Sequence, residues 1–134
     1  MINHGEHGEI QKAEELLIDR GLSYAAQVYR LLGPGLLESV YEVALAYKLG
    51  KARVLVKRQV EAPVIYESIH LGVGFRADLV VEWALLLELK AVEAIKPIYL
   101  AQIISYLKLM EIKRGYILNF NTRLLKEGIK RVSI

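Results

Sequence analysis

Two strongly apolar stretches separated by a short loop constrain the fold of this chain more than any other feature. They cover residues 75–82 and 85–91, with the loop at 82–84. Valine and leucine dominate both stretches, and so short a connection predicts an antiparallel hairpin. Strands this apolar usually lie in the middle of a sheet that is covered on both faces. The segment therefore predicts the central hairpin of an α/β fold.

Two acidic residues interrupt this hairpin, one on each strand. With a loop of three residues, the strand pairing places Asp78 opposite Glu88. Side chains alternate between the two faces of a strand, so both carboxylates fall on one face with Cβ atoms about 5 Å apart. Like charges this close destabilise a fold unless a positive group lies between them. Charged residues in strands otherwise so apolar need a reason, which favours a functional site.

A divalent cation is the natural partner of such an acid pair. Mg²⁺ prefers oxygen ligands, commonly one or two carboxylates together with waters and substrate phosphates. Lys90 projects from the same face two residues beyond Glu88. Its ammonium group could orient or deprotonate an attacking water and neutralise charge on a phosphate. The alternative is that Asp78 and Glu88 are surface acids paired with Arg76 or Lys90.

Three helices are expected outside the hairpin. Apolar residues recur at helical spacing over 9–31, where Gly21 is a candidate break. Gly33-Pro34-Gly35 predicts a stop and a new helix over about 35–49. Pro97 favours the first turn of a third helix, which we expect to end near Met110.

Further strands complete the order α-α-β-β-β-α-β-β. Alternation and valine content predict a strand over 53–66, in which Pro63 favours an edge position or a break. Glycine and serine residues make 67–74 a turn region. We expect the last two strands at 115–120 and 128–134.

Composition places the chain among globular proteins. Its 134 residues fit one domain, and we expect a single α/β domain over 1–134 with residues 1–8 disordered. The chain has no cysteine, which excludes disulfides, a Cys-ligated zinc site and a thiol nucleophile. No apolar run approaches the roughly 20 residues of a membrane helix. The polar N-terminus lacks a secretory signal, so we expect a cytoplasmic protein.

Charge is uneven along the chain, although the net charge is only +3. Residues 1–95 carry 10 basic and 13 acidic side chains, whereas residues 96–134 carry 8 basic and 2 acidic ones. A basic final third can follow a nucleic-acid backbone, or it can be an ordinary solvated surface. Its basic residues are Lys96, Lys108, Lys113, Arg114, Arg123, Lys126, Lys130 and Arg131.

Three motifs resemble those of a nuclease superfamily. Asp78, followed after nine residues by Glu88-Leu89-Lys90, resembles the signature of the PD-(D/E)xK nucleases. The segment Gly35-Leu36-Leu37-Glu38-Ser39-Val40-Tyr41 resembles the motif that names the GxxExxY protein family, a branch of that superfamily. Gln102 and Tyr106 resemble the Gln-xxx-Tyr element that follows the catalytic lysine in the exonuclease branch.

The resemblance extends over about residues 20–134. The segment Gly115–Phe120 is similar to the closing strand of the family. Two positions depart from the pattern. Ala77 stands where proline is common, and Tyr29 stands where a histidine is expected before the Gly-Pro-Gly loop.

The resemblance implies a restriction-endonuclease-like core, in which helices flank a mixed central β-sheet. It also implies a magnesium site, with Mn²⁺ as a second candidate ion, held by Asp78, Glu88 and the carbonyl of Leu89. Lys90 would be the catalytic lysine. Glu38 would be an additional acid that ligates a metal or holds its water, although it could also be an exposed helix acid.

The resemblance further assigns residues that would contact the substrate. Gln102 and Tyr106 lie one helical turn apart and would line the catalytic cleft, although Gln102 could cap a neighbour and Tyr106 could simply pack. A homodimer would double the short groove of so small a domain. From the charge of the final third of the chain, the residues expected to hold nucleic acid are Lys96, Lys108, Lys113 and Arg114.

Two functions are consistent with these residues. The first is a metal-dependent nuclease, a hydrolase of phosphodiester bonds in DNA or RNA, with endonuclease and exonuclease action both open. The second is a binding module, for nucleic acid or protein, that keeps the nuclease fold without catalysis. The intact set of Asp78, Glu88, Lys90 and Glu38 argues against simple decay of an enzyme.

Overall fold

A five-stranded sheet forms the centre of the protein in a computed structural model, which describes residues 4–134 and side chains from residue 8 onward. The strand order follows the sequence, and all neighbouring pairs are antiparallel except β3 and β4, which are parallel. The strands are β1 (Val56–Tyr66), β2 (Ile69–Val81), β3 (Leu85–Lys90), β4 (Arg114–Asn119) and β5 (Ile129–Ser133). The sheet is therefore mixed.

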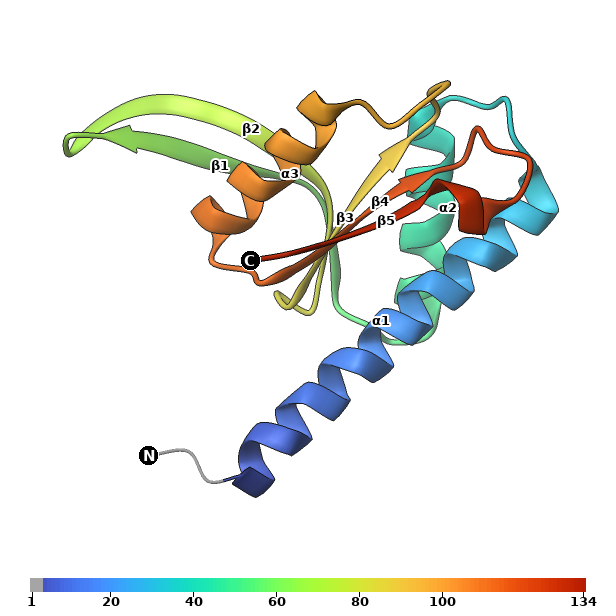
Figure 1. The fold of residues 1–134 in the computed structure, drawn as a ribbon, viewed down its shortest axis with the longest axis horizontal. Helices are drawn as coiled ribbons and strands as arrows, with labels where there is room; N and C mark the ends of the chain where they lie inside the picture. Colours follow the sequence, from blue (N-terminus) through green and yellow to red (C-terminus); the bar gives the residue numbers. More distant parts are fainter. Residues whose placement is uncertain (1–3) are drawn as a thin grey trace.

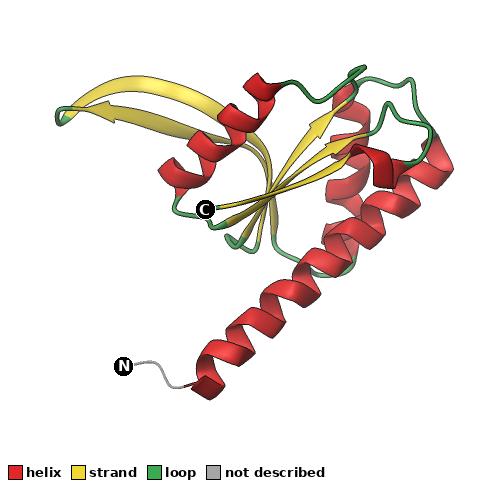
Figure 2. Cartoon of the chain, viewed as in Figure 1, coloured by secondary structure: helices red, strands yellow, loops and turns green. Residues whose placement is uncertain are grey.

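Helices cover both faces of this sheet (Figures 1 and 2). Helices α1 (His4–Leu32) and α2 (Glu38–Lys51) pack on one face. Helix α3 (Pro97–Met110) packs on the other face and connects the parallel strands β3 and β4, a connection that requires a crossover. A short 3-10 helix, η1 (Leu125–Gly128), precedes β5. The predicted α/β class, with a mixed sheet between helices as in restriction endonucleases, is confirmed.

The central hairpin is buried on both faces, as its sequence predicts. Leu85 and Leu87 join the apolar cluster under α1 and α2, whereas Leu86 joins the cluster under α3. Val81 pairs with Leu85 in the sheet register, so the loop has the three residues 82–84 that were expected. Period-two alternation thus gives β3 one apolar face for each helical layer.

Helix α1 is longer than expected and continues through Gly21. It begins at His4, within the segment 1–8 that was expected to be disordered, whereas residues 1–3 lie outside the described residues. Gly21 is buried where α1 meets the sheet, and a Cβ atom there would lie 3.6 Å from Leu85. At Gly21 the helix is therefore continuous and packs against the sheet at ordinary contact distance, with no helix break.

The second helix begins at Glu38, three residues later than expected, because the preceding loop is tied to the core. Gly33 and Gly35 have φ of +69° and +99°, which glycine adopts without steric cost. The buried Tyr41 donates a hydrogen bond to the carbonyl of Gly33 at 2.6 Å and accepts one from the backbone N–H of Leu36 at 3.1 Å. Its ring stacks on Phe120 with centroids 4.4 Å apart. Tyr41 is thus a core residue that also holds the loop.

The prediction of a turn region over 67–74 is wrong. The turn is confined to Glu67 and Ser68, and β2 already begins at Ile69. The two glycines that suggested a turn lie within β2: Gly72 has φ of +97°, and a Cβ atom on Gly74 would overlap the side chain of Val64. Glycine within a strand commonly marks such a close approach or an irregular ladder. Strand β1 lies at the sheet edge, where Pro63 is tolerated, and the ladder shifts there.

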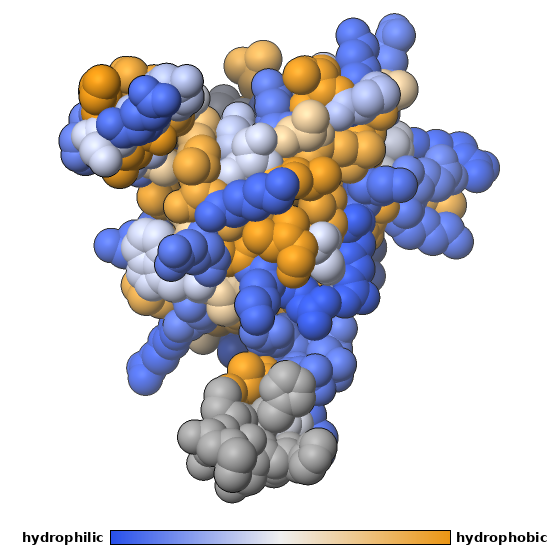
Figure 3. All heavy atoms as spheres, turned by 60° about the vertical axis from the view of Figure 1, so that its left-hand side comes forward, coloured by the Kyte–Doolittle hydropathy of each residue, from blue (hydrophilic) through white to orange (hydrophobic). Residues whose placement is uncertain are grey.

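The end of the β1–β2 hairpin projects beyond the other elements (Figure 1). It exposes several large apolar side chains, which fits the mixture of apolar and hydrophilic surface that Figure 3 shows when this side is turned forward. These side chains are Ile65, Tyr66, Ile69, Leu71 and Val73. Over the described part of the chain, no helix has the length and apolar character needed to cross a membrane.

Candidate active site

The candidate site lies where strands β2 and β3 part. Their ladder runs from Val81 and Leu85 to Leu79 and Leu87 and then stops, one residue short of Asp78 and Glu88. The expected direct pairing of Asp78 with Glu88 is replaced by two hydrogen bonds, each from a backbone N–H to a side-chain carboxylate. The N–H of Asp78 donates to Glu88 Oε1 at 3.1 Å, and the N–H of Leu89 donates to Asp78 Oδ2 at 2.9 Å. Each carboxylate therefore satisfies a backbone donor of the opposite strand.

Glu88 is the most perturbed titratable group among the described residues. Its side chain lies at the end of the apolar β3 strand, and the residue is only 7% exposed. Burial, followed by the charge of Asp78 and a side-chain hydrogen bond with it, raises the pKa of Glu88 to about 9. The bond from the Asp78 N–H and the Lys90 charge act in the opposite direction. A buried carboxyl beside another carboxylate is a site where a cation would be strongly favoured.

Asp78 is held from a second side by Gln59 of β1. The Gln59 amide nitrogen lies 3.2 Å from Asp78 Oδ1 and 2.5 Å from Glu42 Oε1. Glu42 lies on α2, is 5% exposed, and accepts two hydrogen bonds from the Arg58 guanidinium at 2.9 and 3.1 Å. The chain of contacts Arg58–Glu42–Gln59–Asp78 joins α2 and β1 to the site.

Lys90 lies at the end of β3 without a carboxylate ion pair in the described structure. Its ammonium nitrogen lies 4.5 Å from the centroid of the Tyr99 ring on α3, a cation–π distance. It lies near enough to Glu88 for its charge to lower the pKa of that carboxyl. An ammonium group against a ring face keeps its N–H donors available for other partners.

Helix α3 supplies the wall opposite the acids. Tyr106 stacks on Phe75 of β2, with centroids 4.0 Å apart and ring planes at 8°. Partial burial raises the pKa of Tyr106, and the charges of Glu88 and then Asp78 raise it further, which places this ring near both carboxylates. Gln102, one turn earlier, is exposed and makes no hydrogen bond within the described residues.

Glu38 is exposed at the first turn of α2 and does not join Asp78 and Glu88. Its Oε1 accepts a hydrogen bond of 3.2 Å from the N–H of Ala91, the residue after Lys90. Glu38 therefore lies beside the end of β3. Glu42, one helical turn later, is the acid that connects through Gln59 to Asp78.

The carboxylates at this site bear on whether it can hold a divalent metal. Within residues 4–134, no group of three acidic, histidine or cysteine side chains is close enough together to hold an ion. Asp78 and Glu88 nevertheless offer two adjacent carboxylates, and Mg²⁺ commonly takes one or two protein carboxylates with its other positions filled by water and phosphate. The two residues therefore fit a magnesium ion of that kind.

The basic residues expected to hold nucleic acid lie at two ends of the sheet. Lys96 is exposed directly before α3, on the side where β3 ends in Lys90. Lys108 and Lys113 follow at the far end of α3, next to the start of β4. Arg114, at that same far end, pairs with Glu14 of α1 at 3.5 Å. The four residues thus form no single cluster.

Three residues of this site escaped the sequence interpretation: Glu42, Arg58 and Gln59. The only available signal was the spacing of Glu38 and Glu42, which places two acids on one side of a helix. Nothing in the sequence marks Arg58 or Gln59, because β1 reads as an ordinary edge strand. Their contacts depend on the packing of α2 against β1.

Comparison with known proteins agrees with this architecture. A family model described as "PD-(D/E)XK nuclease superfamily" matches residues 17–132. No match was found among curated proteins, and none among solved structures. The matched region covers β1 to β4 and nearly all of β5, together with the acids at the end of the central hairpin and the lysine that follows them. The chain belongs to the PD-(D/E)XK nuclease superfamily.

Proposed function

We propose that this protein is a metal-dependent nuclease that hydrolyses phosphodiester bonds in DNA or RNA. The observation that carries the proposal is the buried Glu88 beside Asp78 at the point where β2 and β3 part, with Lys90 on the same edge. Burial of an acid next to another acid lowers stability, and this cost is typical of a functional site. Membership of a nuclease superfamily supports the same reaction class.

Asp78 and Glu88 would hold the metal, with the Leu89 carbonyl as a further ligand. Members of this superfamily usually use divalent metals, and carboxylate oxygens favour Mg²⁺, or Mn²⁺ in its place. A bound ion would neutralise the two acids and supply Lewis-acid stabilisation of charge on the phosphate. Glu38, hydrogen-bonded beside the end of β3, would hold a water near this site.

Lys90 would act on the attacking water and on the phosphate. Its ammonium lies over the Tyr99 ring, which limits its motion without using its N–H donors. From this position Lys90 would orient or deprotonate the water and neutralise charge that develops on the phosphate. Tyr106 and Gln102 would present a hydroxyl and an amide from α3 to the substrate.

Nucleic-acid binding would rely mainly on Lys96, because it lies at the same end of the sheet as Lys90. Lys108, Lys113 and Arg114 would contact only a substrate that extends along α3, whose 14 residues span about 20 Å. Contacts of this kind bind the phosphate backbone and carry little sequence specificity.

We also assign the chain to the GxxExxY branch of the superfamily. The support is structural: Gly35 adopts φ of +99°, and Tyr41, at the last position of the motif, holds the loop through its hydroxyl group. Glu38, at the acidic position, binds the backbone next to Lys90. Each motif residue thus has a physical function at the entrance to α2.

Metal binding is the first test of the proposed function. Calorimetric titration with Mg²⁺ and Mn²⁺ should give binding to the wild type and none to Asp78→Asn, which removes one carboxylate at constant size. Glu93→Gln, a change of an exposed acid just beyond β3, is the matched control and should bind as the wild type does. Absence of binding at millimolar metal, with an oligonucleotide present to supply phosphate ligands, would rule out the catalytic proposal.

Cleavage assays on single-stranded, duplex and branched DNA and RNA then test the reaction. Lys90→Met should keep metal binding and lose at least about 100-fold in cleavage rate, because the charge that acts on water and phosphate is gone. Equal cleavage by Lys90→Met and the wild type would remove Lys90 from the mechanism.

The competing proposal is a binding module without turnover. It is favoured by the absence of a third acid beside Asp78 and Glu88 in the described structure. This alternative predicts nucleic-acid binding that depends on metal, or binding of a protein partner, with no cleavage of any substrate. The same cleavage assays therefore separate the two functions.

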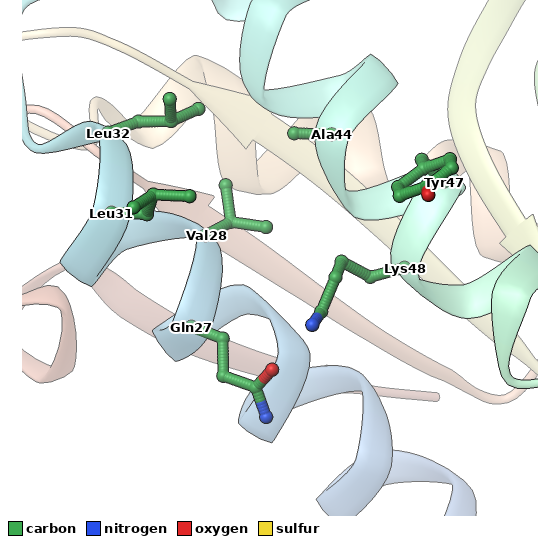
Figure 4. Close-up of a pocket in the computed structure, with 7 residues that line it drawn as sticks. All are labelled: Gln27, Val28, Leu31, Leu32, Ala44, Tyr47 and Lys48. Carbon is green, nitrogen blue, oxygen red and sulfur yellow. The ribbon is translucent and has the colours of Figure 1, made fainter.

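We further propose a homodimer, for which the exposed groove between α1 and α2 is the best support. Figure 4 shows its lining from both helices, with apolar Val28, Leu31 and Leu32 across from Ala44 and Tyr47. Leu31 is 86% exposed and Tyr47 is 65% exposed. A continuous apolar face of this kind often marks a protein interface. Leu31→Glu should halve the mass measured by light scattering, and a wild type that is already monomeric would contradict the dimer.

A further inference from the structure

The backbone of β1 departs from strand geometry at Gln59, directly across from Asp78. Arg58 pairs with Leu79 and Val60 pairs with Ala77, so Gln59 and Asp78 should form the pair between them, yet that pair is missing from the ladder. Gln59 has φ of +51°, a left-handed conformation that raises the free energy of any residue with a Cβ atom. A strained, non-glycine residue in a strand beside a candidate site indicates that its side chain is needed there.

The irregularity changes which face of the sheet the neighbouring side chains reach. Leu79 belongs to the apolar cluster under α1 and α2, whereas Ala77 belongs to the cluster under α3. Strict alternation, which predicts one face for both residues, is therefore broken at Asp78. Local irregularities of this kind redirect side chains next to functional sites.

The side chain of Gln59 bridges two carboxylates. Its amide nitrogen lies within hydrogen-bond distance of Asp78 Oδ1 and Glu42 Oε1. An NH₂ group has two hydrogens and can donate to both acids, whereas a carboxylate at the same position can donate to neither. Both acceptors therefore require a hydrogen-bond donor at this position, which the amide nitrogen of Gln59 supplies.

Glu42 is itself a fixed anchor. Two hydrogen bonds from Arg58 hold its buried carboxylate, and the salt bridge measures 2.9 Å. On the other side of Gln59, Asp78 Oδ2 accepts a hydrogen bond from the N–H of Leu89. With Gln59 on Oδ1, both oxygens of Asp78 are held, and each keeps capacity for one further contact.

We propose that Gln59 is a positioning residue of the metal site, which fixes the carboxylate of Asp78 by tying it to the Glu42–Arg58 pair. The inference rests on the proposed function and adds to it the polar connection that orients one ligand. Partners that orient a metal ligand commonly account for a 10- to 100-fold difference in metal affinity.

Two substitutions remove this connection in different ways. Gln59→Gly deletes the amide and also relieves the backbone strain, because glycine adopts positive φ freely. Gln59→Glu keeps the size of the side chain and replaces the donor by a third carboxylate. Ser68→Gly is the matched control, since Ser68 has φ of +66° in the hairpin turn and no contact with the site.

The first measurement needs no metal. Hydrogen exchange of the Leu89 amide, followed by NMR, reports how firmly Asp78 accepts this bond. Both Gln59 variants should exchange this amide about tenfold faster than the wild type, whereas Ser68→Gly should leave it unchanged. Unchanged exchange in both Gln59 variants overturns the inference.

The second measurement is the Mg²⁺ dissociation constant by calorimetry. Gln59→Gly should bind 10- to 100-fold more weakly, while Ser68→Gly binds as the wild type does. Equal affinity of Gln59→Gly and the wild type would also overturn the inference. If the wild type binds no Mg²⁺, the proposed nuclease function fails, and the Leu89 exchange data still decide whether Gln59 positions Asp78.

Discussion

Replacement of Glu88 by glutamine should stabilise the metal-free protein, and the gain should grow with pH. Glu88 is buried at the end of β3, where it accepts a hydrogen bond from the N–H of Asp78. Glutamine has the same size, keeps an oxygen acceptor for that bond, and can donate from its amide to the Asp78 carboxylate. The substitution therefore removes an ionisable group without removing a contact.

The magnitude follows from the difference between the folded and unfolded pKa of Glu88. The pKa is 4.5 in the reference state and about 9 in the folded protein. Between these values the unfolded chain loses a proton that the folded protein retains, so stability decreases as pH rises. At about 1.4 kcal/mol per pH unit, the wild type loses roughly 3 kcal/mol by pH 7 relative to a residue that never ionises. Below pH 4.5 the difference disappears.

Urea unfolding of the wild type and of Glu88→Gln, measured from pH 4.5 to 8 without divalent metal, tests this reasoning. The advantage of the variant should be near zero at pH 4.5 and reach several kcal/mol at pH 8. At neutral pH the melting temperature should rise by about 10 °C for a domain of this size. Glu93→Gln, at an exposed position, controls for the loss of an acid. A stability difference that does not vary with pH would refute a neutral Glu88.

Three further changes test other parts of the structure. Tyr41→Phe removes the two hydrogen bonds that hold the loop before α2, and denaturant unfolding should show a loss of about 1–3 kcal/mol. Gly74→Ala forces a Cβ atom into Val64, so hydrogen exchange in the projecting end of the β1–β2 hairpin should accelerate while exchange in β3 and β4 stays slow. Lys96→Glu should weaken nucleic-acid binding and reduce its salt dependence more than Lys113→Glu, which lies at the far end of the sheet; equal effects would contradict the placement of the substrate.

The central hairpin shows why some of this fold is readable from sequence. The pairing of Val81 with Leu85 depends only on the length of the loop and on the alternation of side chains, which are local properties. Pro97 at the start of α3 and Pro63 in an edge strand are local signals of the same kind, and both were interpreted correctly. By contrast, Gly72 and Gly74 suggested a turn although they lie within β2. Glycine is common both in turns and at close contacts within strands. The contact that places Gly74 in a strand is with Val64 of the neighbouring strand, which the sequence alone does not reveal.

For the site, the sequence indicated Asp78, Glu88 and Lys90, and the structure brings these three to one end of β3. Tyr106 lies near both acids, as its pKa indicates, while Gln102 is exposed on the same helix. Glu38 binds the backbone of Ala91 instead of meeting the acid pair. The hydrogen bonds that connect Asp78 to Glu42 through Gln59 could not be predicted from the sequence, because they depend on a positive φ in β1 and on the position of α2.

By itself, the sequence determined the order of the elements and the proximity of the two acids, because hairpin register and helical periodicity depend on neighbours along the chain. Only the tertiary structure decided how the acids are held. Strands β2 and β3 part just before Asp78 and Glu88, so each carboxylate binds a backbone N–H instead of facing its counterpart. Packing of both faces buries Glu88 and raises its pKa to about 9. The burial of Glu88 results from the packing of helices on both faces of the sheet, so a local sequence pattern cannot predict it.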